Sequence, residues 1–254
     1  TGGSSTVILD TNPAVNGQAT ATIDTNDGAV KTITVTQKGQ LYTDPPVIEF
    51  TDGTTNPSAT AVLEQYGVIN RIDIADGGAD YSSTPTATVD APATFSFNTF
   101  SDISGSTISI PDNPFTNGLR LVYSTASGSE NTNLVDGNTY YVVNSVGNSF
   151  GLANSQGGSA ISLSQSADDT SAESHSLTGV TATVTLTQSG GEITGITIND
   201  QGTLYDGNSL PSITIDEAGQ TTHATLTVFC GRSLSSISIG SRGSGYTSAP
   251  TVTV

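Results

Sequence analysis

Carboxylates are the side chains of this chain best suited to acid–base chemistry. Hydrolysis of a carbohydrate needs two of them facing each other across a cleft. The clustered candidates are Asp168, Asp169, Glu173, Asp216 and Glu217. All five lie in polar segments typical of turns, where a solvated loop residue is the ordinary interpretation. We therefore expect no catalytic pair.

The histidines and the cysteine also lack a catalytic motif. A nucleophilic triad needs a histidine near a serine or cysteine and an orienting acid, but His175 and His223 have no such companion motif. We predict both to be surface linker residues. Cys230, the only cysteine, excludes an internal disulfide. We expect it in the turn after a strand at Ala224–Phe229, as a small, half-buried apolar residue.

The run Asp24-Thr25-Asn26-Asp27-Gly28 resembles part of a calcium loop. It lacks the full spacing and the distal glutamate of an EF-hand, so we predict a β-turn. Taken with the solvated acids and the few histidines, the sequence predicts a chain that is not an enzyme, holds no metal and needs no cofactor.

The charge of the chain limits the classes of partner that it can bind. Only 11% of the 254 residues are charged, against roughly 25% in ordinary soluble domains. Six basic residues oppose 23 acidic ones, and the formal net charge is −17. The scattered cations cannot form a phosphate-tracking groove, so we expect no nucleic-acid partner. No apolar stretch approaches the ~18 residues of a membrane span, so we expect no membrane insertion.

One spacing recurs four times and governs the organisation of the chain. Each copy has an Ala-Thr strand, a Gly- or Asp-rich turn, an Ile-x-Ile strand, a Gly-x-x-Tyr turn and a Pro-led strand. The repeated residues are Gly39, Tyr42, Pro46, Gly78, Tyr81, Pro85, Gly202, Tyr205, Pro211, Gly243, Tyr246 and Pro250. Such repetition of a whole unit is typical of a structural part rather than of one reactive site.

Each repeated residue has a structural reason. Glycine admits a positive φ or a close backbone approach. The tyrosine ring covers the open end of a small core, with its hydroxyl reaching water or a backbone carbonyl. Proline presets φ at the entry of the last strand. In the third copy the gap from Tyr205 to Pro211 is longer, which predicts a different turn there.

The fold class that follows is all-β: tandem three-stranded β-repeats forming small sandwich-like or prism-like modules. Because one copy cannot bury its core alone, we expect two tandem pairs, at residues 1–97 and 180–254. The first includes an orphan strand at Thr6–Leu9. Residues 98–179 form an inserted small β-barrel or sandwich that projects sideways. Its predicted strands are Thr107–Ile110, Leu119–Tyr123, Thr139–Val143, Ser149–Ala153 and Ala160–Ser164.

Two sets of segments carry a family resemblance. Residues 243–254, Gly-Ser-Gly-Tyr-Thr-Ser-Ala-Pro-Thr-Val-Thr-Val, and residues 182–184, Ala-Thr-Val, resemble a GxGYTxxPxVxV … ATATV repeat. That repeat occurs in virion structural and tail-fibre proteins of bacteriophages, notably phages of marine cyanobacteria, and in some large bacterial surface proteins. Residues 134–143, 148–153 and 160–163 are similar to a companion module of such proteins.

The resemblance implies a non-enzymatic virion protein: a tail fibre, tail accessory or capsid decoration subunit of a bacteriophage. Its expected partners are further copies of itself, a trimer among the options, other virion proteins, and a host-surface glycan or protein. Two alternatives remain open. One is a bacterial extracellular surface or filament adhesin module, and the other is a tailspike-like polysaccharide hydrolase.

Overall fold

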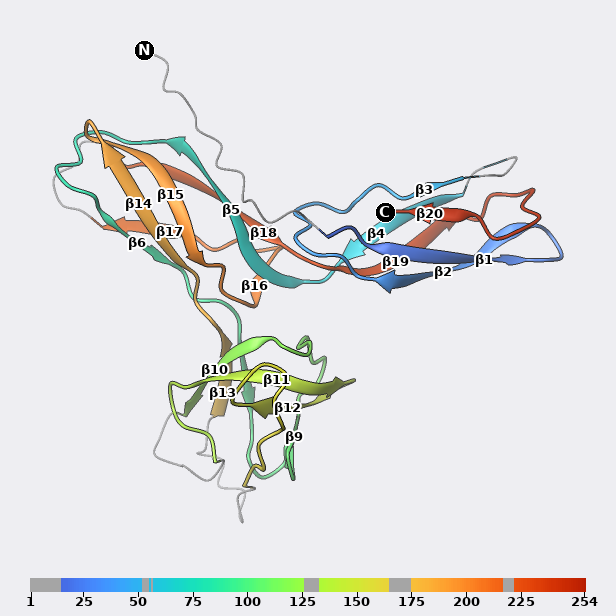
Figure 1. Ribbon diagram of the computed structural model, residues 1–254, viewed down its shortest axis with the longest axis horizontal. Helices are drawn as coiled ribbons and strands as arrows, with labels where there is room; N and C mark the ends of the chain where they lie inside the picture. The colour runs from blue at the N-terminus through green and yellow to red at the C-terminus, as the bar shows by residue number, and fades with distance from the viewer. Residues whose placement is uncertain (1–14, 52–54, 56, 126–132, 165–174, 217–221) are drawn as a thin grey trace.

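The computed structural model describes residues 15–51, 55, 57–125, 133–164, 175–216 and 222–254 (Figure 1). Within these residues the chain forms strands β1 to β20 and no helix. The prediction of an all-β fold is confirmed. The predicted orphan strand at Thr6–Leu9 lies outside the described residues.

One end of the molecule is a group of six strands that we call the first module. A four-stranded antiparallel sheet has the order β2-β1-β20-β3, and a separate pair, β19-β4, packs with β19 against β2. Val30, Phe50 and Leu234 lie in the core between them. The strands are β1 (Gln18–Asp24), β2 (Ala29–Gln37), β3 (Glu49–Phe50), β4 (Ser58–Leu63), β19 (Leu234–Ser241) and β20 (Thr251–Thr253).

The other end, which we call the second module, contains three further sets of strands. They are the pairs β14-β15 and β17-β6 and the three-stranded sheet β16-β5-β18. Their shared core includes Ile69, Ile72, Leu186 and Ile196. The strands are β5 (Tyr66–Asp76), β6 (Thr86–Val89), β14 (Thr183–Ser189), β15 (Glu192–Asp200), β16 (Tyr205–Asp206), β17 (Ile213–Asp216) and β18 (Thr225–Gly231).

Both cores draw on both predicted repeat pairs. The first core combines residues 19–63 with residues 234–254, and the second combines residues 69–89 with residues 182–230. The ends of the chain are therefore interleaved around two shared cores.

Between the two halves of the sequence lies a seven-stranded antiparallel sheet with its own core, which we call the insert. The strand order is β7-β13-β10-β11-β12-β9-β8. Figure 1 shows it projecting to one side of the two modules. The strands are β7 (Thr94–Phe97), β8 (Ile103–Ser104), β9 (Thr107–Ser109), β10 (Arg120–Thr125), β11 (Thr139–Val146), β12 (Ser149–Ala153) and β13 (His175–Gly179).

Four of the five strands predicted in the insert are present. The fifth, Ala160–Ser164, belongs to no strand. It is held at two points, because Ile161 N–H donates to Leu152 O at 2.7 Å and Leu163 N–H donates to Gly105 O at 2.9 Å.

The two modules are joined by an exchange of strands. β4 pairs with β19 rather than with β5, and β5 pairs with β18 rather than with the first module. Residues 58–76 and 225–241 thereby run antiparallel along both modules as one two-stranded ribbon (Figure 1). At the crossing point Glu64 N–H donates to Ser233 O at 2.8 Å.

The exchanged pairs have the same register as the ordinary hairpins. The hairpins β1-β2 and β14-β15 place an apolar residue of the first strand opposite an isoleucine of the second. The exchanged pairs do the same across the chain. The four equivalent pairings are Ala21↔Ile33, Leu186↔Ile196, Val228↔Ile72 and Ala61↔Ile237.

The connections differ in length among the copies. In the first copy residues 24–29 separate the paired Ile23 and Val30, and residues 25–28 make the turn, with Gly28 at φ 63°. In the third copy residues 189–192 separate the paired Gln188 and Ile193, and the turn residues Gly190 and Gly191 both have positive φ. Tight hairpins of this kind require such residues.

The fourth copy has the shortest connection. Its equivalent residues, Cys230 and Leu234, leave only residues 231–233 between them, one fewer than in the third copy. A three-residue hairpin loop classically takes glycine at its third, left-handed position, where this chain has Ser233, so the connection does not favour a hairpin between β18 and β19. β19 pairs with β4 instead, and β18 pairs with β5. The Gly- or Asp-rich turn predicted in every copy is thus wrong for the second and fourth copies.

Engineered cysteines should report the exchange. Thr60 lies opposite Ser238, and both side chains are exposed. Paired residues on neighbouring strands are within the Cα separation that a disulfide spans. We expect Thr60→Cys/Ser238→Cys to form an intramolecular disulfide under mild oxidation, detected by mass spectrometry of linked peptides.

The matched control is Thr60→Cys/Asp73→Cys. Asp73 would face Thr60 only if the second copy closed its own hairpin in the common register, because it occupies the place that Thr34 has opposite Thr20. A disulfide in the control pair and none in the first pair would show that the hairpins close locally.

Candidate functional site

The Gly-x-x-Tyr turn has the same backbone conformation in all four copies. Its glycine lies at positive φ, between 61° and 69°. The residue just before the tyrosine also has positive φ, although in three copies it is not glycine. These residues are Leu41 (63°), Asp80 (64°), Leu204 (58°) and Gly245 (81°). The longer gap of the third copy leaves this turn unchanged and instead adds a turn at residues 206–209.

The tyrosine of the turn holds the start of a first strand. The hydroxyls of Tyr42, Tyr81 and Tyr205 accept hydrogen bonds from the backbone N–H groups of Gly17, Ala224 and Ala182, at 2.5, 2.9 and 2.8 Å respectively. In these three turns the hydroxyl therefore acts as an acceptor, and the predicted contact with a backbone carbonyl is present at Tyr205. The corresponding position before β4 is Pro57, which has no N–H group.

Tyr205 is the most buried of the four. Its hydroxyl also lies 3.2 Å from the carbonyl oxygen of Asp90, to which it donates. Desolvation raises the pKa of Tyr205. A phenol that donates and accepts within the core is a structural cap, since it has no free face to offer a ligand.

The prolines stand where predicted, ahead of the third strands. Pro85 and Pro250 are buried and directly precede β6 and β20. Pro46 and Pro211 are half-buried and precede β3 and β17 by a few residues. The fixed φ of proline suits an irregular strand entry that needs no N–H donor.

The repeated glycine is required by space as well as by φ. A Cβ on Gly202 would lie 2.6 Å from Val180 O and 2.7 Å from Ala182 N. Gly39 and Gly78 have equivalent neighbours at 2.5 to 2.7 Å. The strand start that the tyrosine holds therefore crosses directly over the glycine.

Gly202→Ala should destabilise the fold far more than Gly190→Ala. Both residues have φ near 65°, but among the described residues no atom lies within 4 Å of the Cβ position of Gly190. Backbone strain alone should lower the free energy of unfolding by about 1–2 kcal/mol in Gly190→Ala. In Gly202→Ala the added clash should increase this loss to about 3 kcal/mol or more. Urea unfolding measures both, and equal losses would show that close approach plays no part.

The residues considered for chemistry do not come together. Asp168, Asp169, Glu173 and Glu217 lie outside the described residues, and Asp216 is exposed in β17. His223 is exposed, as predicted. Residues 24–28 form the predicted turn, in which Gly28 N–H donates to Asp24 O at 2.9 Å and the Asn26 N–H lowers the pKa of Asp24.

His175 is not a surface linker residue, so that prediction is wrong. Its side chain is 0% exposed, and Nδ1 lies 2.6 Å from the hydroxyl of Tyr123. The two rings stack with centroids 5.8 Å apart. His175 occupies the inward position in the alternation of β13, with Leu177 and Gly179. The sequence signal that was missed is this two-residue alternation.

Cys230 also differs from its prediction. It lies inside β18 rather than in a turn, it is 3% exposed, and its Sγ donates to Tyr205 O at 3.5 Å. Burial raises the pKa of this thiol to about 11, which keeps it protonated and unreactive at neutral pH.

No three His, Cys, Asp or Glu side chains of the described residues cluster closely enough to hold a metal ion. Among those same residues, no helix is long and apolar enough to cross a membrane.

An ion pair attaches the insert to the second module. Arg120 of β10 donates to both carboxylate oxygens of Asp200, at 2.8 and 2.5 Å. Thr203 adds a bridge, accepting from Val180 N–H and donating to Arg120 O. The hydrogen bonds from Arg120 lower the pKa of Asp200, and the same pairing raises the pKa of Arg120.

The lowered pKa makes this attachment pH-dependent. Because the folded-state pKa of Asp200 lies below its unfolded value, the stabilisation is complete above about pH 4 and is lost as pH falls through the folded-state pKa. We expect Asp200→Asn to lower the free energy of unfolding by about 1 kcal/mol at pH 7 and to leave it almost unchanged at strongly acid pH. Urea unfolding at both pH values tests this, with Asp216→Asn as an exposed control. A pH-independent loss would contradict it.

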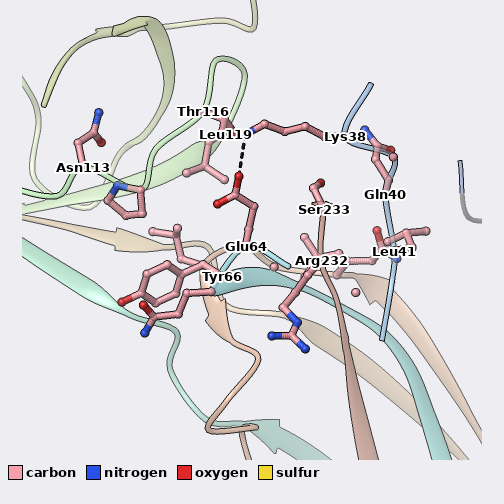
Figure 2. A pocket seen from close by; sticks show the side chains of 18 of the residues that line it. Lys38, Gln40, Leu41, Glu64, Tyr66, Asn113, Thr116, Leu119, Arg232 and Ser233 are labelled. Atoms are coloured by element: carbon pink, nitrogen blue, oxygen red, sulfur yellow. Dashed lines mark hydrogen bonds and ion pairs between the residues drawn. The ribbon is translucent and has the colours of Figure 1, made fainter. Parts of the chain in front are cut away.

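A groove lies where the insert meets the ribbon crossing (Figure 2). Its volume is about 920 Å³. It is lined by residues 37–41, 64–68 and 231–233, by part of residues 111–119 of the insert, and by Val15, Phe95, Gln201 and Leu204. Lys38 extends across it to Glu64, with Nζ and Oε1 2.6 Å apart (Figure 2). These residues are distant in sequence and meet only because the strands exchange, so no local motif could have revealed the groove.

Comparison with known proteins gave no match to a family model, to a curated protein or to a solved structure.

Proposed function

We propose that this chain is a non-enzymatic structural protein of a bacteriophage virion, acting as a tail fibre, tail accessory or capsid decoration subunit. The observation that carries the proposal is the exchanged ribbon. Residues 58–76 and 225–241 cross from one core to the other along the long axis of the molecule (Figure 1). Pulling the modules apart along that axis would shear many backbone hydrogen bonds at once, which suits a part that carries mechanical load.

The proposed architecture pairs one complete copy with one composite copy in each module. The first module would join β1, β2 and β3 to β4, β19 and β20, and the second would join β14, β15 and β17 to β18, β5 and β6. Each would be a small sandwich-like unit of two three-stranded repeats, with the insert as an appended barrel or sandwich.

Sequence features support the same assignment. The repeat segments at 243–254 and 182–184 resemble phage virion proteins, and the hydroxyl-rich, acidic surface suits exposure to water. We further propose that the chain forms homo-oligomers, with a trimer as the simplest fibre, and contacts other virion proteins.

A second candidate is a bacterial surface or filament adhesin module. The sideways position of the insert favours it. A domain that projects from the two modules, and is attached through the Arg120–Asp200 ion pair, would be accessible to a partner. Both candidates use the ribbon as a scaffold and differ in where the protein is located.

Fractionation of lysed cultures that carry the gene separates the two. Antibodies against the recombinant chain should detect it in virions purified on a density gradient, and immunogold labelling should place it on their exterior. Recovery in cell envelopes with none in particles would overturn the virion assignment. Glycan degradation by the pure protein that is lost on changing one acid would overturn the non-enzymatic one.

A further inference from the structure

The groove at the ribbon crossing has a rigid aromatic wall. Tyr66 and Phe95 line it with ring centroids 5.7 Å apart at 78°. Phe95 also packs edge-on against Phe115 at 5.1 Å, and Phe115 against the buried Phe150 at 4.8 Å. This chain of rings fixes the wall to the core of the insert, so a ligand would meet a preformed surface.

Opposite this wall the groove is polar. Gln37 and Gln40 are exposed at its edge, and an amide can both donate to and accept from a hydroxyl. The Lys38–Glu64 pair offers further donors and acceptors while cancelling its own charge.

The remaining charges also balance. Arg232 and Asp112 line the groove in addition to the Lys38–Glu64 pair. The guanidinium of Arg232 is turned toward Thr43 O at 3.4 Å and packs beside Gly207. The groove therefore has no excess of positive charge to attract an anion, in a chain whose net charge of −17 repels one.

From these contacts we propose that the groove binds a neutral oligosaccharide. A sugar ring has one apolar face, which matches Tyr66, and a rim of hydroxyls, which matches the glutamines and the ion pair. The volume of about 920 Å³ lies within the range of small-ligand sites. A purely apolar ligand would desolvate the Lys38–Glu64 pair without replacing its water contacts.

This site depends on the exchange of strands and not on the proposed virion role. Residues 64–68 and 231–233 span the two places where the ribbon passes from one module to the other, and both line the groove. The result of a sugar-binding test is therefore independent of whether the chain is a virion protein or a surface adhesin.

Saturation-transfer NMR with three neutral sugars tests the proposal: cellohexaose, maltohexaose and chitohexaose at millimolar concentration. We expect transfer to at least one of them. Tyr66→Ala should weaken that binding about tenfold by removing the aromatic face. Because Tyr66 also packs on Phe95, the second variant is Thr116→Trp, which fills the groove from an exposed position.

The control is Thr34→Trp, the same change at an exposed position of β2 that does not line the groove. It should leave binding unchanged. The proposal is overturned if none of the three sugars shows transfer, or if Thr116→Trp binds as well as Thr34→Trp. It is also overturned if only hexagalacturonate or a Ser/Thr hexapeptide binds, which would indicate an anionic glycan or a protein partner.

Discussion

Pairing between strands that are far apart in the sequence shapes the whole molecule. β4 pairs with β19 and β5 pairs with β18, in the register that the two local hairpins share. The short connection at residues 231–233 favours this exchange, because it has Ser233 where a three-residue hairpin loop takes glycine. The two shared cores, the long ribbon and the groove at its crossing all depend on this pairing.

The local features of the repeat were predictable from sequence because each depends on one residue type. Glycine at positive φ, tyrosine over the end of a core and proline before a strand occur in all four copies. The strand pairing was not predictable in the same way. Four first strands with the same pattern fit four second strands equally well, so the pattern alone does not choose between a hairpin and an exchange.

The errors at individual residues have a similar origin. His175 and Cys230 were assigned from polarity or from an assumed turn, whereas each lies at an inward position of a strand. Tyr123 makes burial of His175 tolerable by a hydrogen bond that spans 52 residues of sequence. The groove could not be predicted for the same reason, since the segments that line it meet only in three dimensions.

The pairing of β4 with β19 also constrains biosynthesis. Ser58 bonds to Ser241, 183 positions later, so the first module cannot be completed on the ribosome until the strands β19 and β20 have been translated. Until then β4 remains an open strand edge, the kind of surface on which nascent chains aggregate. Chaperone demand and slow maturation are the expected cost of completing a module with strands that are translated so much later.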